Sequence, residues 1–311
     1  MSSTPGPVPM LHRHRRTLFI ISFLAAPVAL YLIYVISPYL QAFYIATTNW
    51  RGVSATPEFI GLDNFRRMLG DDTFWKAVTH NAALLVLLPV VTIAIALFFA
   101  FLLNVGGAKG TAGIFGSKVY RVVFFFPHVL AYTVVAVLFQ QVFRPDGSGM
   151  LNAPLMALGL GPIGFLSDPG VAFWSVLGVM VWQAVGFYVV LFSAGLASIP
   201  RDMFEAAQID GAGRISLFFR ITIPLLWDTV QVAWVYLGIL ALDVFAIVWV
   251  MTDQHGGPDY STTVMAAEIY RNAFQYSLFG YASALGVVMF FFTVGFAILS
   301  LRLSRRERIE Y

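Results

Sequence analysis

One ionisable side chain lies inside a long apolar run of this sequence, where it could bind a polar solute or an ion. Asp243 follows a stretch of apolar residues, and Tyr236 lies seven residues before it, on the same face of a helix. An ionisable group within a membrane is costly and normally faces a cavity or a partner group. Asp243 is therefore a candidate for contact with a transported solute. Other roles also fit it: a structural ion pair, a hydrogen bond between helices, or an interfacial position near the outer end.

A second set of polar and aromatic residues lies in an earlier apolar run. Gln183 could hydrogen-bond the hydroxyl groups of a sugar while an aromatic ring, such as the neighbouring Trp182, stacks on the sugar. Tyr188 is a weaker candidate for the same role. The alternative is that Gln183 joins two helices by a hydrogen bond, which is the commoner role of glutamine in a helix bundle.

Residue patterns that support catalysis do not occur in the sequence. It has no cysteine and no G-x-S-x-G or H-E-x-x-H motif, and its five histidines lack metal-ligand spacing. It also lacks the G-x-x-x-x-G-K-[ST] loop that binds nucleotide phosphates, because the nearest string, from Gly110 to Lys118, has the wrong spacing. We therefore predict no catalytic residue, no metal site and no cofactor in this chain. Energy for any transport would come from another chain or from an ion gradient.

Ile199–Pro224 is a polar segment between two long apolar runs, with the pattern of a short amphipathic helix followed by a turn. The stretch from Phe204 to Ile209 favours a helix, since alanine is the best helix former. Asp202 can cap this helix because Glu205 follows it at capping-box spacing. Gly211 supplies the left-handed conformation that ends a helix.

This predicted helix carries small and acidic residues that suit docking to a soluble partner. Ala206 and Ala207 allow close approach of another surface, and Glu205 and Asp210 offer carboxylates to it. Three apolar residues at helical spacing then lead back into the apolar part of the chain: Phe218, Ile221 and Leu225. The alternative is an ordinary connector at the membrane surface.

Length and composition indicate a polytopic membrane protein. Of the 311 residues, 59% are hydrophobic and only 11% are charged, and the mean hydropathy is +0.78. Soluble domains carry about 25% charged residues. The sequence contains six segments of the roughly 20 residues needed to cross a bilayer as a helix. Their predicted bounds are 17–46, 79–104, 120–143, 171–197, 224–251 and 278–302, so the predicted fold class is all-α with six transmembrane helices.

The distribution of basic residues predicts the orientation. Thirteen of the 19 lysines and arginines fall in the two tails and in the second and fourth loops. By the positive-inside rule, both termini and the polar segment lie in the cytoplasm. The predicted parts are a tail 1–16, a first helix 17–46, an outer loop 47–78, a five-helix core 79–302 containing the cytoplasmic loop 198–223, and a tail 303–311.

The remaining segments give smaller predictions. The net charge of +3 could suggest nucleic acid or anionic lipid, but the positions of the charges favour topology as its explanation. Membrane lipid is a predicted partner, and nucleic acid is not. The first apolar run is longer than the core of a signal peptide and lacks a small-x-small cleavage site, which favours a retained span. A short helix is predicted over Asp63–Leu69 with Asp63 or Asn64 as its cap, and 144–170 is predicted to consist of turns.

Several motifs occur in a fixed order along the chain. They are Phe59-Ile60-Gly61-Leu62-Asp63-Asn64-Phe65, Leu196-Ala197-Ser198-Ile199-Pro200, then Glu205-Ala206-Ala207-x-x-Asp210-Gly211-Ala212 with Phe218, Ile221 and Pro224, and finally Gly256-Gly257-Pro258. This set resembles binding-protein-dependent ABC importer permeases, whose "EAA" loop matches the third motif. The closest branch is the sugar permeases of the maltose and glycerol-phosphate type.

The resemblance implies a type I importer permease fold and a division of labour between chains. Glu205–Ala212 would be a coupling helix that sits in a groove of a cytoplasmic ATPase, of which there would be two copies holding ATP and Mg²⁺. A second homologous permease and an extracellular or periplasmic sugar-binding protein would complete the transporter in the bacterial plasma membrane. The chain would be a transport subunit and not an enzyme, carrying a mono- or oligosaccharide, with an amino sugar among the candidates.

Two departures from the family pattern limit what can be carried over. Asp228 stands where the family often has a second proline, and Ala246 follows Phe245 where an acidic residue is common. The acid lies earlier, at Asp243, so the family's substrate contacts do not transfer to this region. The alternative function is an ion-coupled secondary transporter that uses Asp243, although one intramembrane acid and no repeat give it little support.

Overall fold

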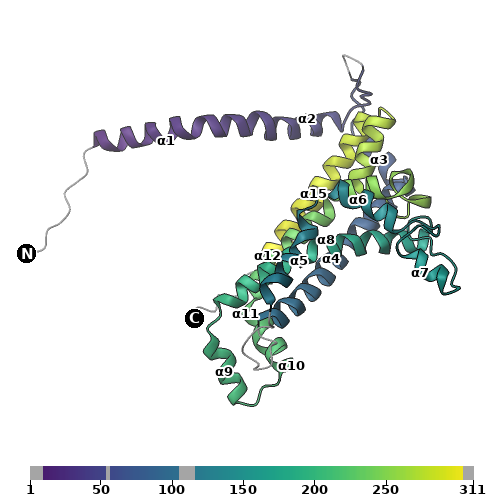
Figure 1. Ribbon diagram of the computed structural model, residues 1–311. Coiled ribbons are helices and arrows are strands. Elements are labelled where there is room, and N and C mark those ends of the chain that lie inside the picture. Colours follow the sequence, from purple (N-terminus) through teal and green to yellow (C-terminus); the bar gives the residue numbers. More distant parts are fainter. Residues whose placement is uncertain (1–9, 54–56, 105–115, 304–311) are drawn as a thin grey trace, which may run out of the picture.

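The computed structural model describes residues 10–53, 57–104 and 116–303, which form a bundle of helices (Figure 1). No β-strand occurs in these ranges, although one antiparallel bridge pairs Thr48 with Phe59. Three predicted features lie outside the described residues: the first part of the N-terminal tail, the basic loop residue Lys109, and the tail from 304 onward. The first helix already begins at Met10, earlier than the predicted bound of 17.

Helices account for most of the described chain. The helical segments up to residue 160 are α1 Met10–Tyr31, the π-helical η1 Leu32–Ile36, α2 Ser37–Ile45, α3 Asp63–Leu69, α4 Asp72–Asn104, α5 Ser117–Val129, α6 Tyr132–Val142 and α7 Asn152–Ala157. The segments after it are α8 Pro169–Ser198, α9 Arg201–Ile209, α10 Arg214–Ser216, the π-helical η2 Leu217–Thr222, α11 Ile223–Leu225, α12 Trp227–Leu242, α13 Ala246–Met251, the 3-10 turns η3 Asp253–His255 and η4 Pro258–Tyr260, α14 Met265–Tyr270, the π-helical η5 Arg271–Gln275 and α15 Phe279–Leu303.

The predicted number of spans agrees with the described part of the chain. Four helices are long and apolar enough to cross a membrane: Phe19–Ile45, Asp72–Asn104, Pro169–Ser198 and Phe279–Arg302. Two bent pairs bring the number to six if each pair counts as one span: Val119–Val129 with Tyr132–Val142, and Arg214–Leu225 with Trp227–Leu242.

α4 and α8 form the centre of the bundle. Leu88 of α4 and both Met180 and Phe192 of α8 are among the large side chains that are fully buried. α5 packs against α8 and α12 packs against α4. Gly186 allows the backbones of α5 and α8 to meet, because a Cβ atom there would overlap the carbonyl oxygen of Phe124. In a membrane, close backbone approach of this kind is a main source of helix association.

The first helix is the least enclosed part of the structure. α2 packs against α15, but α1 projects away from the bundle in Figure 1. Apolar side chains along this segment are open, with Phe23 at 70% and Tyr34 at 73% exposure. Such a surface requires lipid or another protein to cover it.

Two of the predicted spans are broken, which corrects their description as continuous helices over 120–143 and 224–251. α5 and α6 meet at an angle of 98°, where Leu130 adopts an extended conformation. The fifth span bends by 72° after α11, at Leu226, and it breaks again at residues 243–245 between α12 and α13. Backbone groups freed at such breaks must be satisfied within the protein, because lipid offers no hydrogen bonds.

A second cluster of buried residues lies at the end of the bundle opposite α9, where α3, α14 and α15 meet. α3 has the predicted bounds, but the predicted cap is wrong. Leu62 occupies the cap position without a side-chain hydrogen bond, and Asp63 lies in the first turn. Asn64 is instead buried and donates to the carbonyls of Ala46 and Thr48, both at 2.8 Å.

The loop predicted to consist of turns contains α7, which corrects that prediction. Asn152 at its start donates to the carbonyls of Arg144 and Ile163 at 2.8 and 3.0 Å. Its side-chain oxygen also accepts from the amide of Ile163 at 2.8 Å. These contacts, which span 8 and 11 residues within the loop, hold the short helix in place.

Candidate functional site

The polar segment forms α9 at one end of the bundle, the end toward which the C-terminal part of α15 also runs (Figure 1). The helix begins at Arg201, and Pro200 takes the cap position without a side-chain hydrogen bond. The predicted cap, Asp202, lies instead in the first turn. There its carboxylate still complements the positive end of the helix dipole. The capping prediction was wrong because the helix starts two residues earlier than a cap at Asp202 implies, immediately after Pro200.

α9 ends as predicted, at a glycine in the left-handed conformation. Gly211 has φ +84°, and its amide donates to the carbonyl of Gln208 at 3.0 Å. The amide of Ala212 donates to the carbonyl of Ala207 at 2.9 Å. Together these two bonds form a Schellman motif, which satisfies carbonyls that the helix end would leave open.

The two faces of α9 differ in burial. Phe204 is 5% exposed, and Met203 and Ala207 pack half-buried against the same core cluster. The outward side is exposed and consists of Asp202, Glu205, Ala206, Ile209, Asp210 and Gly211, which we name the α9 face. Ile209 is 86% exposed, an unusual position for an aliphatic side chain beside carboxylates. Of the two predicted contact alanines, Ala206 lies on this face, whereas Ala207 turns inward.

The segment after α9 attaches it to the centre of the bundle. Leu217 is 1% exposed, and the ring of Phe218 lies 5.2 Å from that of Phe101 in α4. Ile221 and Leu225 also pack against the main core cluster, as the helical spacing predicts. α9 is therefore attached to the core by its inner face, through Phe204, and by the segment that follows it, through Leu217 and Phe218.

Asp243 lies at the second break of the fifth span. The prediction placed it within a continuous helix, but α12 ends at Leu242 and Asp243 follows with its side chain exposed. Tyr236 is 68% exposed and Ile239 is 39% exposed, so an open stripe runs along α12 to Asp243. The spacing of three and four residues places these three side chains on one helical face, as the sequence indicates.

A buried asparagine supports this break. Asn81 of α4 is 4% exposed, and its amide donates to the carbonyls of Ala241 and Leu242 at 2.9 and 3.2 Å. Its side-chain oxygen accepts from the amide of Met265 at 2.8 Å. Asn81 thus satisfies carbonyls that the end of α12 frees and ties α4, α12 and α14 together. We did not single out this role from the sequence, because Asn81 resembles any polar residue near the start of a span.

Two glutamines donate hydrogen bonds to backbone carbonyls at the bend between α5 and α6 and at the end of α13. Gln183 is 1% exposed and donates to the carbonyl of Leu130 at 2.9 Å, at the bend between α5 and α6. Gln140 donates to the carbonyl of Val250 near the end of α13 at 2.6 Å. The observed contact of Gln183 is thus a hydrogen bond between helices, which was the alternative to sugar binding.

The other two predicted sugar-contact residues, Tyr188 and Trp182, differ in exposure. Tyr188 is 5% exposed and packs in the main core cluster. Trp182 is 42% exposed, and its ring meets that of Phe139 at 5.1 Å. Of the five predicted residues, only Asp243, Tyr236 and Trp182 therefore present open side chains.

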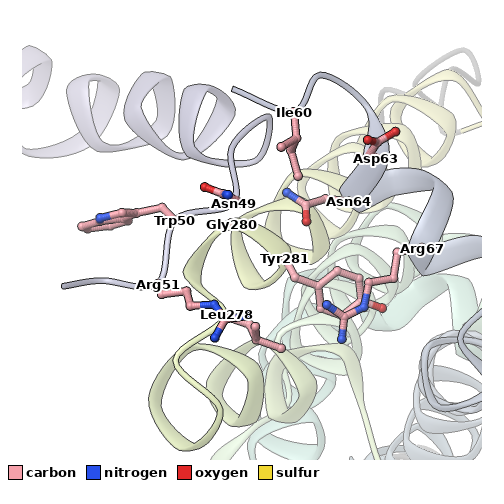
Figure 2. A pocket seen from close by; sticks show the side chains of 10 residues that line it. All are labelled: Asn49, Trp50, Arg51, Ile60, Asp63, Asn64, Arg67, Leu278, Gly280 and Tyr281. Carbon is pink, nitrogen blue, oxygen red and sulfur yellow. The ribbon is translucent and has the colours of Figure 1, made fainter. Parts of the chain in front are cut away.

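A polar cavity of about 320 Å³ lies at the end opposite α9, between the loop after α2, α3 and the start of α15 (Figure 2). Arg67 reaches over the ring of Tyr281, 4.6 Å from its centroid, while Arg51 and Trp50 line the other side. The hydroxyl of Tyr281 donates to Asp71 at 2.7 Å. This cavity could not be predicted from the sequence, because its residues come from segments that are far apart in the chain.

Comparison with known proteins places the chain in a family. Residues 82–309 match the family described as "Binding-protein-dependent transport system inner membrane component". The chain belongs to this family. It is a multi-pass transport subunit of the bacterial plasma membrane, and not an enzyme. The resemblance inferred from the Glu205–Ala212 motif is thereby confirmed at the level of the family.

Several curated relatives cover most of the chain. The chain is similar to the diacetylchitobiose uptake system permease protein NgcF of Streptomyces coelicolor, with 41% identity over 93% of this chain and 83% of the relative. It is also similar to the multiple sugar-binding transport system permease protein MsmF of Streptococcus mutans, with 31% identity over 93% of this chain and 96% of that protein.

Solved structures support the fold. A chain of a bacterial ABC transporter involved in the import of alginate matches with a TM-score of 0.81 and 23% identity, covering 96% of this chain and 98% of that one. A second structure holds the alginate transporter in complex with a periplasmic protein bound to an alginate pentasaccharide, and it matches with a TM-score of 0.80 over 94% of this chain and 96% of that one. The fold is therefore that of a type I importer permease, as predicted.

Proposed function

We propose that this chain is a permease subunit of an ATP-driven importer for a mono- or oligosaccharide. The names of its curated relatives support a sugar as the solute, since they include a diacetylchitobiose permease at 41% identity and a multiple-sugar permease at 31%. The open side chains of Asp243, Tyr236 and Trp182 fit this class of solute. A carboxylate accepts hydrogen bonds from hydroxyl groups, and aromatic rings pack against the faces of a sugar.

The observation that carries the coupling part of the proposal is the α9 face. It presents three carboxylates beside the 86% exposed Ile209 at the end of the bundle, while Phe204 fixes the opposite side of the helix in the core. An exposed aliphatic residue surrounded by acids suits a groove with an apolar floor and basic or amide donors at its rim. A cytoplasmic ATPase would supply that groove, and it would hold the ATP and Mg²⁺ that this chain has no loop to bind.

The full transporter would contain this chain, a second homologous permease, two copies of the ATPase and a sugar-binding protein on the outer side. Closure of the ATPase dimer would push on the α9 face. Buried contacts from Phe204 and Leu217 would carry this motion to α4 and α12, and so to the open stripe that ends at Asp243. In this proposal the sugar contacts Asp243, Tyr236 and Trp182. The ATPase contacts four residues of the α9 face: Glu205, Ala206, Asp210 and Gly211. Ala207 and Ala212 would act from beneath, by holding the end of α9.

The test is transport by the four-component complex in proteoliposomes, with labelled sugar outside and ATP inside. Glu205→Lys and Gly211→Pro are expected to lower sugar uptake per ATP hydrolysed at least tenfold while the affinity of the binding protein for sugar is unchanged. Gly211→Pro acts through the backbone, because proline cannot adopt φ +84°. Asp72→Lys is the matched control, since it reverses an exposed charge at the opposite end of the bundle. Wild-type coupling in both α9 variants would refute the assignment of this face.

The same experiment distinguishes the ATP-driven importer from the alternative, an ion-coupled transporter that uses Asp243. Uptake that requires no ATPase, and that collapses when an ionophore removes the ion gradient, would favour it. Uptake that requires ATP and continues with the ionophore present supports the importer. Asp243 would then serve the sugar and not an ion.

A further inference from the structure

Six aromatic side chains form a continuous series of ring contacts at the outer end of the bundle. Neighbouring centroids lie 4.7 to 5.9 Å apart, within the range of favourable ring contacts. The rings come from the loop after α2, the start of α15, η5, α14, α13 and the break before α13. In spatial order they are Trp50, Phe279, Phe274, Tyr270, Trp249 and Phe245, and we name them the aromatic ladder.

The ladder is not simply part of the core. Phe274 is 66% exposed and Tyr270 is 39% exposed, although both contact other rings. The large side chains that are fully buried in this protein are mostly aliphatic, such as Leu88 and Met180. Two of the six rings are therefore open and the other four are half-buried, and the open rings require lipid, a ligand or another chain to cover them.

The inner end of the ladder lies in the break of the fifth span that also contains Asp243. Phe245 lies two residues after this carboxylate, in the same break of the fifth span. A charged group facing lipid is costly, so the open surface around Asp243 borders water or protein and not the hydrocarbon. The nearest ladder rings, Phe245 and Trp249, stack at 5.3 Å with 28° between their planes and begin at that polar position.

The outer end of the ladder reaches the cavity of Figure 2. Trp50 is among the residues that line that cavity, and its carbonyl accepts a hydrogen bond from the amide of Gly280 at 2.9 Å. Its ring points away from Arg67 and Tyr281 in Figure 2. The ring of Phe279 lies 5.3 Å from Trp50 and leads to the open Phe274. The ladder therefore runs from a residue that lines the cavity to the break of the fifth span that contains Asp243.

Buried polar contacts keep the ladder in place. Arg271 pairs with Glu268 where both are nearly inaccessible, with side-chain exposures of 5% and 6%. Arg271 also donates to the carbonyl of His255 at 3.0 Å, and the His255 ring stacks on Trp249 at 4.1 Å with 7° between the planes. His255 has φ +59°, a conformation that costs about 1–2 kcal/mol for a residue other than glycine. A strained residue held by an ion pair against one face of Trp249 indicates that the position of this ring matters.

We propose that the aromatic ladder is a sugar-binding track, along which the imported sugar passes from the outer cavity to Asp243. The proposal rests on the proposed function of the chain as a sugar permease. The C–H bonds on the face of a pyranose ring carry small positive charges, and they meet the negative face of an aromatic ring. Stacking of this kind has no fixed hydrogen-bond direction, so a sugar exchanges one ring for the next without a large barrier. Asp243 then accepts hydrogen bonds from the sugar hydroxyl groups at the inner end.

The test compares ladder variants in the complete transporter with its binding protein at saturating concentration. N-acetylglucosamine, maltose, xylose and diacetylchitobiose, each labelled, are first offered to the wild type, and the one transported fastest is used. Phe274→Leu and Tyr270→Leu keep the apolar volume but remove the π face. Each is expected to lower the maximum uptake rate about two- to tenfold, the factor that corresponds to one lost aromatic contact. Phe274→Trp and Tyr270→Phe retain a π face and are expected to transport at close to the wild-type rate.

Controls separate this proposal from misfolding and from failure of the proposed function. Phe126→Leu removes a 62% exposed ring in α5, outside the ladder, and is expected to leave uptake unchanged. Basal ATP hydrolysis and co-purification of all subunits report assembly in every variant. Wild-type rates in both leucine variants of the ladder would overturn the track while leaving the permease assignment intact. A wild type that imports none of the four sugars would overturn the proposed function and the track together.

Discussion

Replacement of Asn81 by alanine tests whether the break at Asp243 is held by a single buried amide. The side chain makes three hydrogen bonds, to the carbonyls of Ala241 and Leu242 and from the amide of Met265. Asn81→Ala removes all three and leaves the backbone groups without these partners in a site that is 4% exposed. Each lost hydrogen bond costs about 1 kcal/mol net, so we expect a loss of about 3–4 kcal/mol in the free energy of unfolding.

A loss of this size is measurable in the purified transporter. At roughly 2–4 °C per kcal/mol, the midpoint of thermal unfolding should fall by roughly 6–15 °C. Sugar uptake should fall with it, because the freed carbonyls let α12 and α14 separate from α4. The assays are thermal unfolding of the detergent-solubilised complex and uptake into proteoliposomes at a temperature below both midpoints.

Thr79→Val is the matched control. Thr79 lies two residues earlier on α4, is exposed, and donates only to the carbonyl of Trp75 within its own helix, at 2.8 Å. Its replacement should shift the midpoint by about 2 °C or less. If Asn81→Ala shifts the midpoint no more than Thr79→Val, the break is held by other contacts, and the role assigned to Asn81 is wrong.

Three further substitutions have distinct expected outcomes. Gly186→Val should prevent assembly, because its side chain would overlap the carbonyl of Phe124 where α5 meets α8; recovery of a stable complex on co-purification would contradict this. Gln183→Ala should destabilise the complex by about 1–3 kcal/mol, since it leaves the carbonyl of Leu130 without its partner, and an unchanged unfolding midpoint would refute that role. Asp243→Ala should change stability by less than about 0.5 kcal/mol, because the side chain is exposed, but it should lower uptake severalfold; uptake equal to that of the wild type would remove Asp243 from the sugar path.

The sequence predicts well those features that depend on local residue types. The bounds of α3, the glycine that ends α9 and the return of Phe218 to the core all follow from propensity, backbone freedom and helical spacing. The six spans follow from apolar length alone. The segment that forms α9 is recognisable from its motif, Glu205-Ala206-Ala207-x-x-Asp210-Gly211-Ala212.

Features that depend on contacts between distant segments could not be predicted. The break after Leu242 leaves no mark in the apolar pattern, because the amide that supports it comes from Asn81, about 160 residues earlier in the chain. The role of Gln183 could not be predicted for the same reason. The sequence shows a polar residue in a span, but not the carbonyl of Leu130 to which it donates. The aromatic ladder could not be predicted either, because aromatic residues are frequent throughout the chain. Only their arrangement in space distinguishes these six.

The two parts of the fifth span have different neighbours. α12 packs mainly against α4, whereas α13 packs mainly against α6. A rotation that begins at α9 can therefore turn α12 and α4 together while α13 and α6 stay in place. Residues 243–245 would then absorb the difference in motion between α12 and α13, so that stiffening this short stretch would slow import without altering the ATPase contact.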